Sequence, residues 1–174
     1  MAILLLAEHA DGHLSPATLA TIGAARALSE KGAGDIAVLV AGADCAAAAE
    51  EAARIAGIAK VLTATDAAYD HGLAENIAGL VVALAPGYSH VLAPATTYGK
   101  NILPRASALL DSQQISEITE VIDTETFVRP IYAGNALATV RCKDAIKVIT
   151  VRATGFEKAA PADGTATIET VTGP

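Results

Sequence analysis

Four ionisable side chains, Glu8, His9, Asp11 and His13, lie close together just after the first apolar run of the chain. Carboxylates and imidazoles could bind a metal ion or perform acid–base catalysis, which would make the chain a small α/β enzyme. Two histidines separated by three residues have no fixed geometry outside a helix, and a polar loop needs no ligand to explain it. We therefore interpret residues 8–13 as a solvated loop and keep the enzyme as an alternative.

Residues 93–105 form a second candidate site, because they combine hydroxyls, a glycine and two cations. Two threonines precede Gly99, and Lys100 and Arg105 follow it. If the segment opens a helix at the carboxyl end of a strand, the helix N-terminus would favour an anion or a carboxylate of a partner. Capping of that helix would explain the threonines equally well.

A third cluster, residues 129–135, lies in a part of the sequence that is typical of β structure. It contains Arg129, Pro130, Tyr132 and a Gly-Asn pair. Turn geometry accounts for the Gly-Asn pair. Arg129 has no such local role, so it is free to pair with a carboxylate.

The motifs of common nucleotide and hydrolase sites do not occur. No GxGxxG follows the first apolar run, no GxxxxGK(S/T) is present, and no serine lies within GxSxG. Gly32 and Gly34 predict the end of a helix and a turn. The other reactive side chains are interpreted as follows: Cys45 and Cys142 as buried thiols, Glu50 and Glu51 as a solvated helix face, and His71 and His90 as surface or strand-edge residues.

The composition excludes other classes of protein. Of the 174 residues, 52% are hydrophobic and 18% are charged, which allows a buried core without disulfides or metal ions. The net charge of −7 argues against a nucleic-acid partner, because binding to phosphates requires clustered cations. No apolar run approaches the roughly 18 residues of a membrane span, and the first residues lack a basic targeting segment. We expect a cytoplasmic protein that does not insert into a membrane.

Strands of the buried type alternate with amphipathic helices up to about residue 110. Strands that are apolar on both faces belong at the centre of a parallel sheet, and the helices between them cover both of its faces. The sequence therefore predicts a three-layer, doubly wound α/β fold with a mainly parallel sheet. The predicted strands are residues 3–7, 36–40, 61–64 and 90–93, and the predicted helices are residues 16–31, 45–56, 74–85 and 97–110.

Three residues mark the predicted helix boundaries. Ser15 and Asp44 are expected to cap the first and second helices, because their side-chain oxygens can accept bonds from free N–H groups. Pro104 is expected to kink the fourth helix or to mark a late start.

After Asp111 the pattern changes to four β-like runs, residues 115–122, 127–133, 136–141 and 146–152. We expect hairpins that extend the sheet in antiparallel fashion or form a small excursion from it. Residues 159–164 have the composition of a linker, and an edge strand over residues 165–171 is possible beyond it.

Two long segments resemble the N-terminal domain of the α subunit of electron transfer flavoproteins. Residues 98–117 resemble the GKNLLPRxAALLD...QxIS(D/E) stretch of that family, and residues 129–136 resemble its RPIYAGNA segment. Residues 3–9 and 151–156 also fit. The similarity covers about the whole chain, and two long motifs in the right order are more specific than any short pattern.

The resemblance implies a three-layer α/β domain of the adenine-nucleotide α-hydrolase-like kind. In that family the domain pairs with a similar β subunit by pseudo-twofold symmetry, and the two support a separate FAD domain. The assembled αβ protein carries electrons from acyl-CoA and other dehydrogenases to a membrane quinone reductase. It binds FAD, and AMP belongs to the β subunit. The chain would thus be part of an electron carrier and not an enzyme.

The resemblance also implies a division of the chain. Residues 1–158 correspond to the N-terminal domain, and residues 159–174 to a connection toward an FAD domain that this chain does not include. No catalytic, cofactor-binding or metal-binding residue is carried over. Arg105, Arg129 and Tyr132 are the expected interface or domain-anchoring residues. The alternative function is a stand-alone nucleotide-binding module of the stress type, which would bind AMP or ATP.

Overall fold

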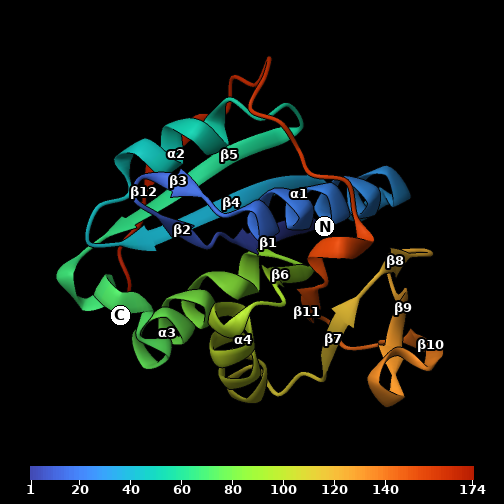
Figure 1. Cartoon of the computed structure of the whole chain (residues 1–174). Helices are drawn as coiled ribbons and strands as arrows, with labels where there is room; N and C mark the ends of the chain where they lie inside the picture. The colour runs from blue at the N-terminus through green and yellow to red at the C-terminus, as the bar shows by residue number, and fades with distance from the viewer.

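A parallel sheet of seven strands forms the centre of the computed structural model, which describes residues 1–174 (Figure 1). The strand order is β12-β5-β4-β1-β6-β11-β7, and all neighbouring strands are parallel. This confirms the predicted doubly wound fold. The strands are β1 (Ala2–Leu6), β4 (Asp35–Gly42), β5 (Ile58–Thr65), β6 (His90–Pro94), β7 (Gln114–Ile118), β11 (Lys147–Val151) and β12 (Thr167–Thr170).

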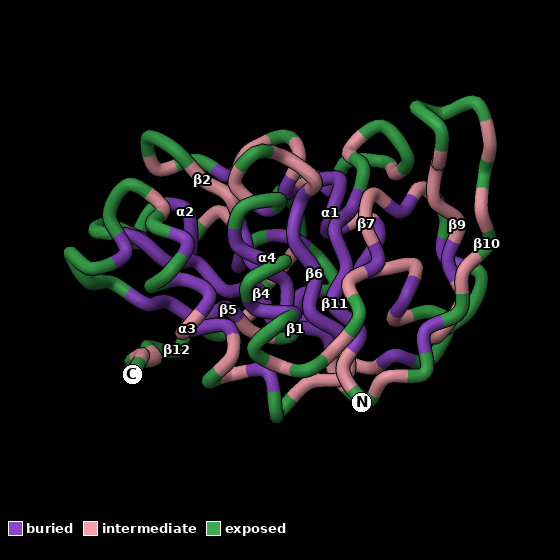
Figure 2. The backbone as a smooth tube through the Cα atoms, turned by 90° about the horizontal axis from the view of Figure 1, so that it is seen from below, coloured by how far each residue is buried: buried purple, intermediate pink, exposed green.

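Helices cover both faces of this sheet, because alternate side chains of each strand point to opposite faces. Ile3 and Leu5 of β1 pack with α1 (Pro16–Leu28) and α2 (Ala46–Ala53). Leu4 and Leu6 pack on the other side with α3 (Ala74–Leu84) and α4 (Thr97–Leu109). Figure 2 shows the resulting buried centre, with exposed residues in the connecting loops. No helix is long and apolar enough to cross a membrane.

The helix boundaries follow the predicted caps closely. The Ser15 side chain accepts a bond from the backbone N–H of Thr18, and Pro16 occupies the first turn of α1. A short π-type segment, Ser29–Ala33, ends α1 with Gly32 at a φ of 96°. Of the two roles predicted for Pro104, the late start was wrong, because α4 begins seven residues before this proline and continues past it.

The second helix is shorter than predicted. Asp44 Oδ1 accepts a bond from the N–H of Ala46 at 3.1 Å, as expected of a capping residue. However, Cys45 occupies the capping position itself and α2 ends at Ala53. The reason is tertiary: Ile55 leaves the helix to form isolated bridges with Ala162 and Asp163.

A separate antiparallel sheet follows α4 and β7. It consists of β8 (Glu120–Val121), β9 (Thr126–Ile131) and β10 (Ala136–Arg141) in the order β10-β9-β8. This confirms the predicted small excursion. Hairpin pairing was wrong for β7 and β11, which pair in parallel inside the main sheet. Apolar alternation alone does not determine whether two strands pair in parallel or antiparallel fashion.

The smaller elements complete the chain. A two-residue pairing of β2 (His9–Ala10) with β3 (His13–Leu14) follows β1. Cys45 and Cys142 are free and buried as predicted, and burial raises the pKa of both thiols, so they stay protonated. Single turns of 3-10 helix are η3 (Ala85–Gly87), η4 (Tyr132–Gly134) and η5 (Ala153–Gly155), and the longer η2 covers Ala67–Gly72.

His90 is fully buried at the start of β6, so the expectation of a surface or strand-edge position was wrong. Its Nε2 donates to the Thr124 carbonyl at 2.7 Å, and its Nδ1 lies 2.9 Å from the Ser89 hydroxyl. Burial lowers the pKa of His90, and the nearby Lys147 and the chain's amino terminus lower it further. The imidazole is therefore neutral where it connects β6 to the turn between β8 and β9.

The buried imidazole predicts a pH-dependent stability. The unfolded chain has a His90 pKa near 6.5 and the folded chain a lower one, so the unfolded state binds more protons below pH 6.5 or so. Stability should be full above that pH and fall as the pH is lowered, by at most about 1.4 kcal/mol per pH unit. Urea unfolding at several pH values measures the free energy of unfolding of the parent chain and of His90→Gln. The difference between the two free energies should become smaller as the pH is lowered. A constant gap would contradict it.

Candidate functional site

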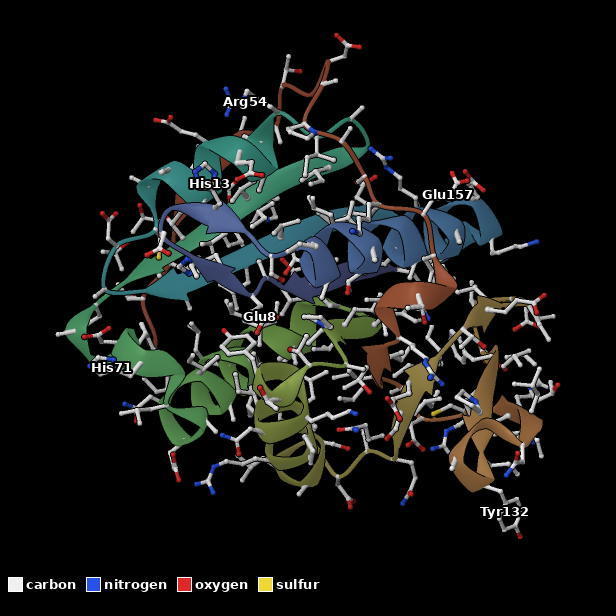
Figure 3. The ribbon with its side chains drawn as sticks, in the orientation of Figure 1. Glu8, His13, Arg54, His71, Tyr132 and Glu157 are labelled. Carbon is white, nitrogen blue, oxygen red and sulfur yellow. The ribbon has the colours of Figure 1, made fainter.

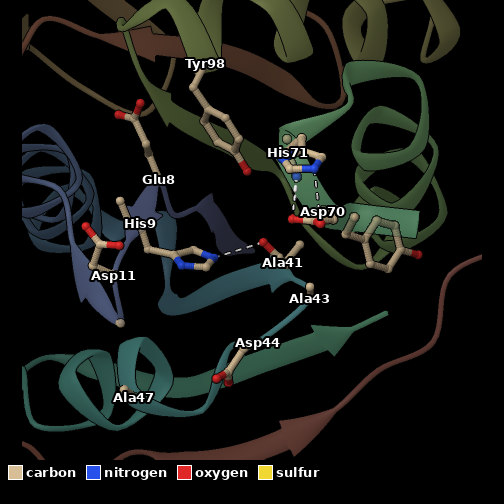
Figure 4. Close-up of a pocket in the computed structure, with 15 residues that line it drawn as sticks. Glu8, His9, Asp11, Ala41, Ala43, Asp44, Ala47, Asp70, His71 and Tyr98 are labelled. Carbon is tan, nitrogen blue, oxygen red and sulfur yellow. Dashed lines mark hydrogen bonds and ion pairs between the residues drawn. The ribbon is translucent and has the colours of Figure 1, made fainter. Parts of the chain in front are cut away.

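A cavity of about 590 Å³ lies at the carboxyl edge of the sheet, where β1 and β6 are neighbours and the strand order reverses (Figure 4). This is the place at which doubly wound folds bind ligands. Its lining comes from the segment after β1, the end of β4 and the loop that follows, the η2 turn, and one residue each of α2 and α4. Its polar lining consists of Glu8, His9, Asp11, Asp44, Tyr69, Asp70, His71 and Tyr98.

The charge of this cavity is negative. Four carboxylates line it and neither lysine nor arginine does. The Tyr98 ring points into the cavity, and burial together with Glu8 raises the pKa of its hydroxyl, which therefore stays neutral. A nucleotide phosphate would meet like charges and no cation here, which is electrostatically unfavourable.

The histidines after β1 do not converge on one point. His9 Nε2 lies 2.9 Å from the Ala41 carbonyl inside the cavity, whereas the exposed His13 lies 3.3 Å from Glu51 on α2. Glu51 also accepts a bond from the N–H of Leu14, so this predicted solvated carboxylate holds the β3 turn against α2. No group of three His, Cys, Asp or Glu side chains is placed to hold a metal ion.

Side chains of residues 93–105 form contacts within the chain itself. The Thr96 side chain caps α4 by accepting from the N–H of Gly99 at 3.5 Å. Lys100 forms an ion pair with Glu117 of β7 at 3.0 Å. The predicted capping role is confirmed for Thr96. Arg105 is exposed on α4 and forms no hydrogen bond or ion pair.

The structure brings together two of the three predicted interface residues. Arg129 and Tyr132 both lie on the β9–β10 hairpin, while α4 with Arg105 lies on the other side of β7 (Figure 1). Arg129 is half-buried, and its Nε donates to the Ser116 carbonyl at 2.8 Å. Tyr132 is 80% exposed at the end of the hairpin and points away from the molecule (Figure 3).

Two features of this region were missed by sequence reasoning. Leu137 of β10 is 69% exposed, although an alternating strand residue of this type usually faces a core. A cavity of about 450 Å³ lies where the hairpin meets β7. Its lining includes the cations Arg129, Arg141 and Lys143 but only one carboxylate, Asp144. The one available signal was the absence of Asp and Glu from residues 126–141.

These features define a doubly wound α/β domain whose carboxyl-edge cavity is lined by four carboxylates and by no lysine or arginine. Residues 3–174 match the model of the electron transfer flavoprotein domain, and the chain belongs to that family.

Named relatives agree with this assignment. The chain is 58% identical over all of its 174 residues to the electron transfer flavoprotein subunit alpha of Pseudomonas aeruginosa, of which it covers 55%. It is 53% identical over 169 residues, 97% of the chain, to the subunit alpha of Paracoccus denitrificans, of which it covers 53%. Against the mitochondrial subunit alpha of Dictyostelium discoideum, identity is 45% over 95% of the chain and 48% of the relative. The chain spans about half the length of these relatives.

Proposed function

We propose that this chain is the N-terminal scaffold domain of an electron transfer flavoprotein α subunit. The similarity of the entire chain to named α subunits, at up to 58% identity, carries this proposal. In the assembled protein the domain pairs with a β subunit and supports the part that holds FAD. Residues 159–174, which include the edge strand β12, then run from the domain toward that part, and the complete protein acts in the cytoplasm.

The role of the chain is assembly, not catalysis. The complete protein accepts electrons from acyl-CoA and other dehydrogenases and passes them to a quinone reductase, and the FAD supplies the redox chemistry. We propose Arg105, Arg129 and Tyr132 as residues that anchor the partner subunit or the FAD-binding part. Arg105 and Tyr132 are exposed and Arg129 keeps two unpaired terminal nitrogens, which supports this role.

The lining of the carboxyl-edge cavity does not fit the phosphates of FAD or AMP. The cavity is lined by Glu8, Asp11, Asp44 and Asp70 and by no lysine or arginine. A pyrophosphate requires free N–H groups and positive charge. We therefore propose that other parts of the assembled protein bind the FAD and that the β subunit binds the AMP.

Co-purification tests this proposal. The chain and a longer α subunit that includes it are each co-expressed with the electron transfer flavoprotein β subunit of the same source, and the complexes are isolated by gel filtration. Both lengths should retain the β subunit, and only the longer one should show stoichiometric flavin absorbance. Stoichiometric flavin on the short chain alone would contradict the proposal.

The alternative is a stand-alone module that binds AMP or ATP, favoured by the position and size of the carboxyl-edge cavity. Its four carboxylates oppose this function. Calorimetric titration of the same purified chain with AMP and with ATP distinguishes the two. We expect no saturable binding, and saturation at one equivalent would establish the module instead.

A further inference from the structure

The carboxyl-edge cavity holds negative charge that the chain itself does not neutralise. Its four carboxylates belong to Glu8, Asp11, Asp44 and Asp70. None of them forms an ion pair with a lysine or an arginine, and the one contact with a basic side chain joins Asp70 to His71 at 3.3 Å. Because like charges in one cavity repel one another, a cation that enters is attracted by all four.

The Tyr98 side chain is a second feature that points to an occupant. It extends from the first turn of α4 into the cavity (Figure 4). Its hydroxyl forms no hydrogen bond within the chain, and burial raises the pKa of that hydroxyl, as does the charge of Glu8. Since enclosed hydroxyls in proteins are normally hydrogen-bonded, the missing partner is expected to come from outside the chain. An N–H group of a bound cation could donate to the Tyr98 oxygen.

The lining of the cavity determines which class of group fits it. An apolar group would remove water from four carboxylates without replacing their hydrogen bonds. No three His, Cys, Asp or Glu side chains are placed to hold a metal ion. An ammonium or guanidinium group fits, because it donates charge-assisted hydrogen bonds to several carboxylates at once. The aromatic side chains of Tyr69 and Tyr98 in the lining also favour a cation.

The last residues of the chain indicate where such a cation comes from. Just after β12, the N–H of Val171 donates to the Thr63 carbonyl at 2.8 Å. Gly173 packs so closely on Tyr69 that a Cβ atom would overlap the tyrosine hydroxyl, and Pro174 lies against α3 (Figure 1). Tyr69 also lines the cavity, so the end of the chain lies against a residue of the cavity wall. In the proposed subunit, the FAD-binding part starts from this position.

We propose that the carboxyl-edge cavity receives a lysine or arginine side chain from the FAD-binding part of the same α subunit. The cation pairs with Asp44 and Asp70 and donates a hydrogen bond to the Tyr98 hydroxyl. A part that is tethered at Pro174 is present at high effective concentration, so a contact of modest intrinsic affinity is sufficient. This inference rests on the proposed function and goes beyond it by naming the contact and its chemistry.

Hydrogen exchange by mass spectrometry tests the inference. The free chain, its complex with the β subunit, and the flavin-loaded complex of the longer α subunit with the β subunit are compared. Backbone amides of the η2 segment, residues 67–72, should exchange about 10-fold more slowly in the complex of the longer subunit than in the other two samples. The reason is that η2 supplies one wall of the cavity and is covered when the FAD-binding part docks.

Charge variants of the longer subunit determine whether the cavity causes this protection. Asp44→Asn/Asp70→Asn removes two charges but keeps the oxygens that accept from the N–H groups of Ala46 and His71. Protection of residues 67–72 should then fall to within about twofold of the complex of the short chain. The matched control is Glu30→Gln/Asp35→Asn, which removes two exposed charges at the amino edge of the sheet and should leave the protection unchanged.

Each contrary outcome has a distinct meaning. If the cavity variant keeps its full protection in a flavin-loaded complex, the cavity is not the receptor. If the β subunit alone protects residues 67–72 of the short chain, the β subunit is the occupant and the proposal is overturned. Calorimetric titration of the short chain with spermidine should show no saturable binding below about 1 mM, and saturation there would make a free amine the occupant. If neither length retains the β subunit, the proposed function fails and the inference fails with it.

Discussion

A single added methyl group at Gly99 should reduce stability by more than about 4 kcal/mol, an exceptional loss for so small a change. Gly99 lies in the first turn of α4, directly against the end of β6. A Cβ atom at this position would overlap the carbonyl oxygen of Pro94 and lie 3.1 Å from its carbonyl carbon and 3.3 Å from the Ala93 Cβ. Pro94 is buried at the end of a central strand and pairs with Val151 of β11, so its backbone cannot move aside without disturbing that neighbour.

A matched substitution in another helix isolates the effect of this close approach. In Gly79→Ala the new Cβ would lie 3.9 Å from the Pro174 side chain and meet nothing closer. Since alanine is the better helix former, this variant should gain up to about 1 kcal/mol. Urea unfolding followed by circular dichroism measures the free energy of unfolding of both glycine-to-alanine variants. Equal stabilities would show that α4 can lift away from β6 at little cost.

Truncation of Phe127 to alanine should cost about 3–5 kcal/mol, the usual loss for a large core aromatic. Phe127 is fully buried at the base of β9 and packs in the same core cluster as Ile118 and Val151. The antiparallel sheet is thereby joined to the main sheet. Loss of the ring should also release the hairpin, so amide hydrogens of β9 and β10 should exchange faster than those of β1.

The neighbouring residue provides the control for Phe127. Val128→Ala removes apolar atoms from the half-buried outer face of the same strand and should cost less than about 1 kcal/mol. Urea unfolding gives the stabilities, and hydrogen exchange by mass spectrometry locates the change. Similar losses for the two variants would mean that Phe127 does not anchor the antiparallel sheet.

Much of the fold could be predicted because its signals are local. Three signals each predict their element without information from the rest of the chain. They are the apolar run of β1, the Ser15-Pro16 start of α1 and the glycines that follow α1. The pairing of β7 with β11 could not be predicted, since it is decided by residues more than thirty positions apart, as in the bond between Glu117 and Thr150. The buried position of His90 depends on the distant Thr124 carbonyl in the same way.

The candidate site shows a similar division. Arg129 and Tyr132 stand out in the sequence because they lie within four residues of each other, with a proline between them and a Gly-Asn turn just after them. Leu137 does not stand out, because an apolar residue in an alternating strand has the same pattern whether its face is covered by the chain itself or by nothing. Arg105 lies on the helix that the sequence predicts over residues 97–110, but the separation of this helix from the β9–β10 hairpin follows from the topology alone.

The edge strand β12 determines when the sheet can be completed during synthesis. It pairs with β5 over Thr167–Thr170, and the bond between Thr63 and Glu169 spans 106 residues. Until β12 emerges from the ribosome, the outer backbone groups of β5 have no partner, and such open edges promote aggregation. The side chains of β12 are exposed, and Glu169 lies 3.5 Å from Lys60. The completed edge of the sheet therefore carries charged groups. The outer edge of β5 therefore stays open in the nascent chain until residues 167–170 have been synthesised.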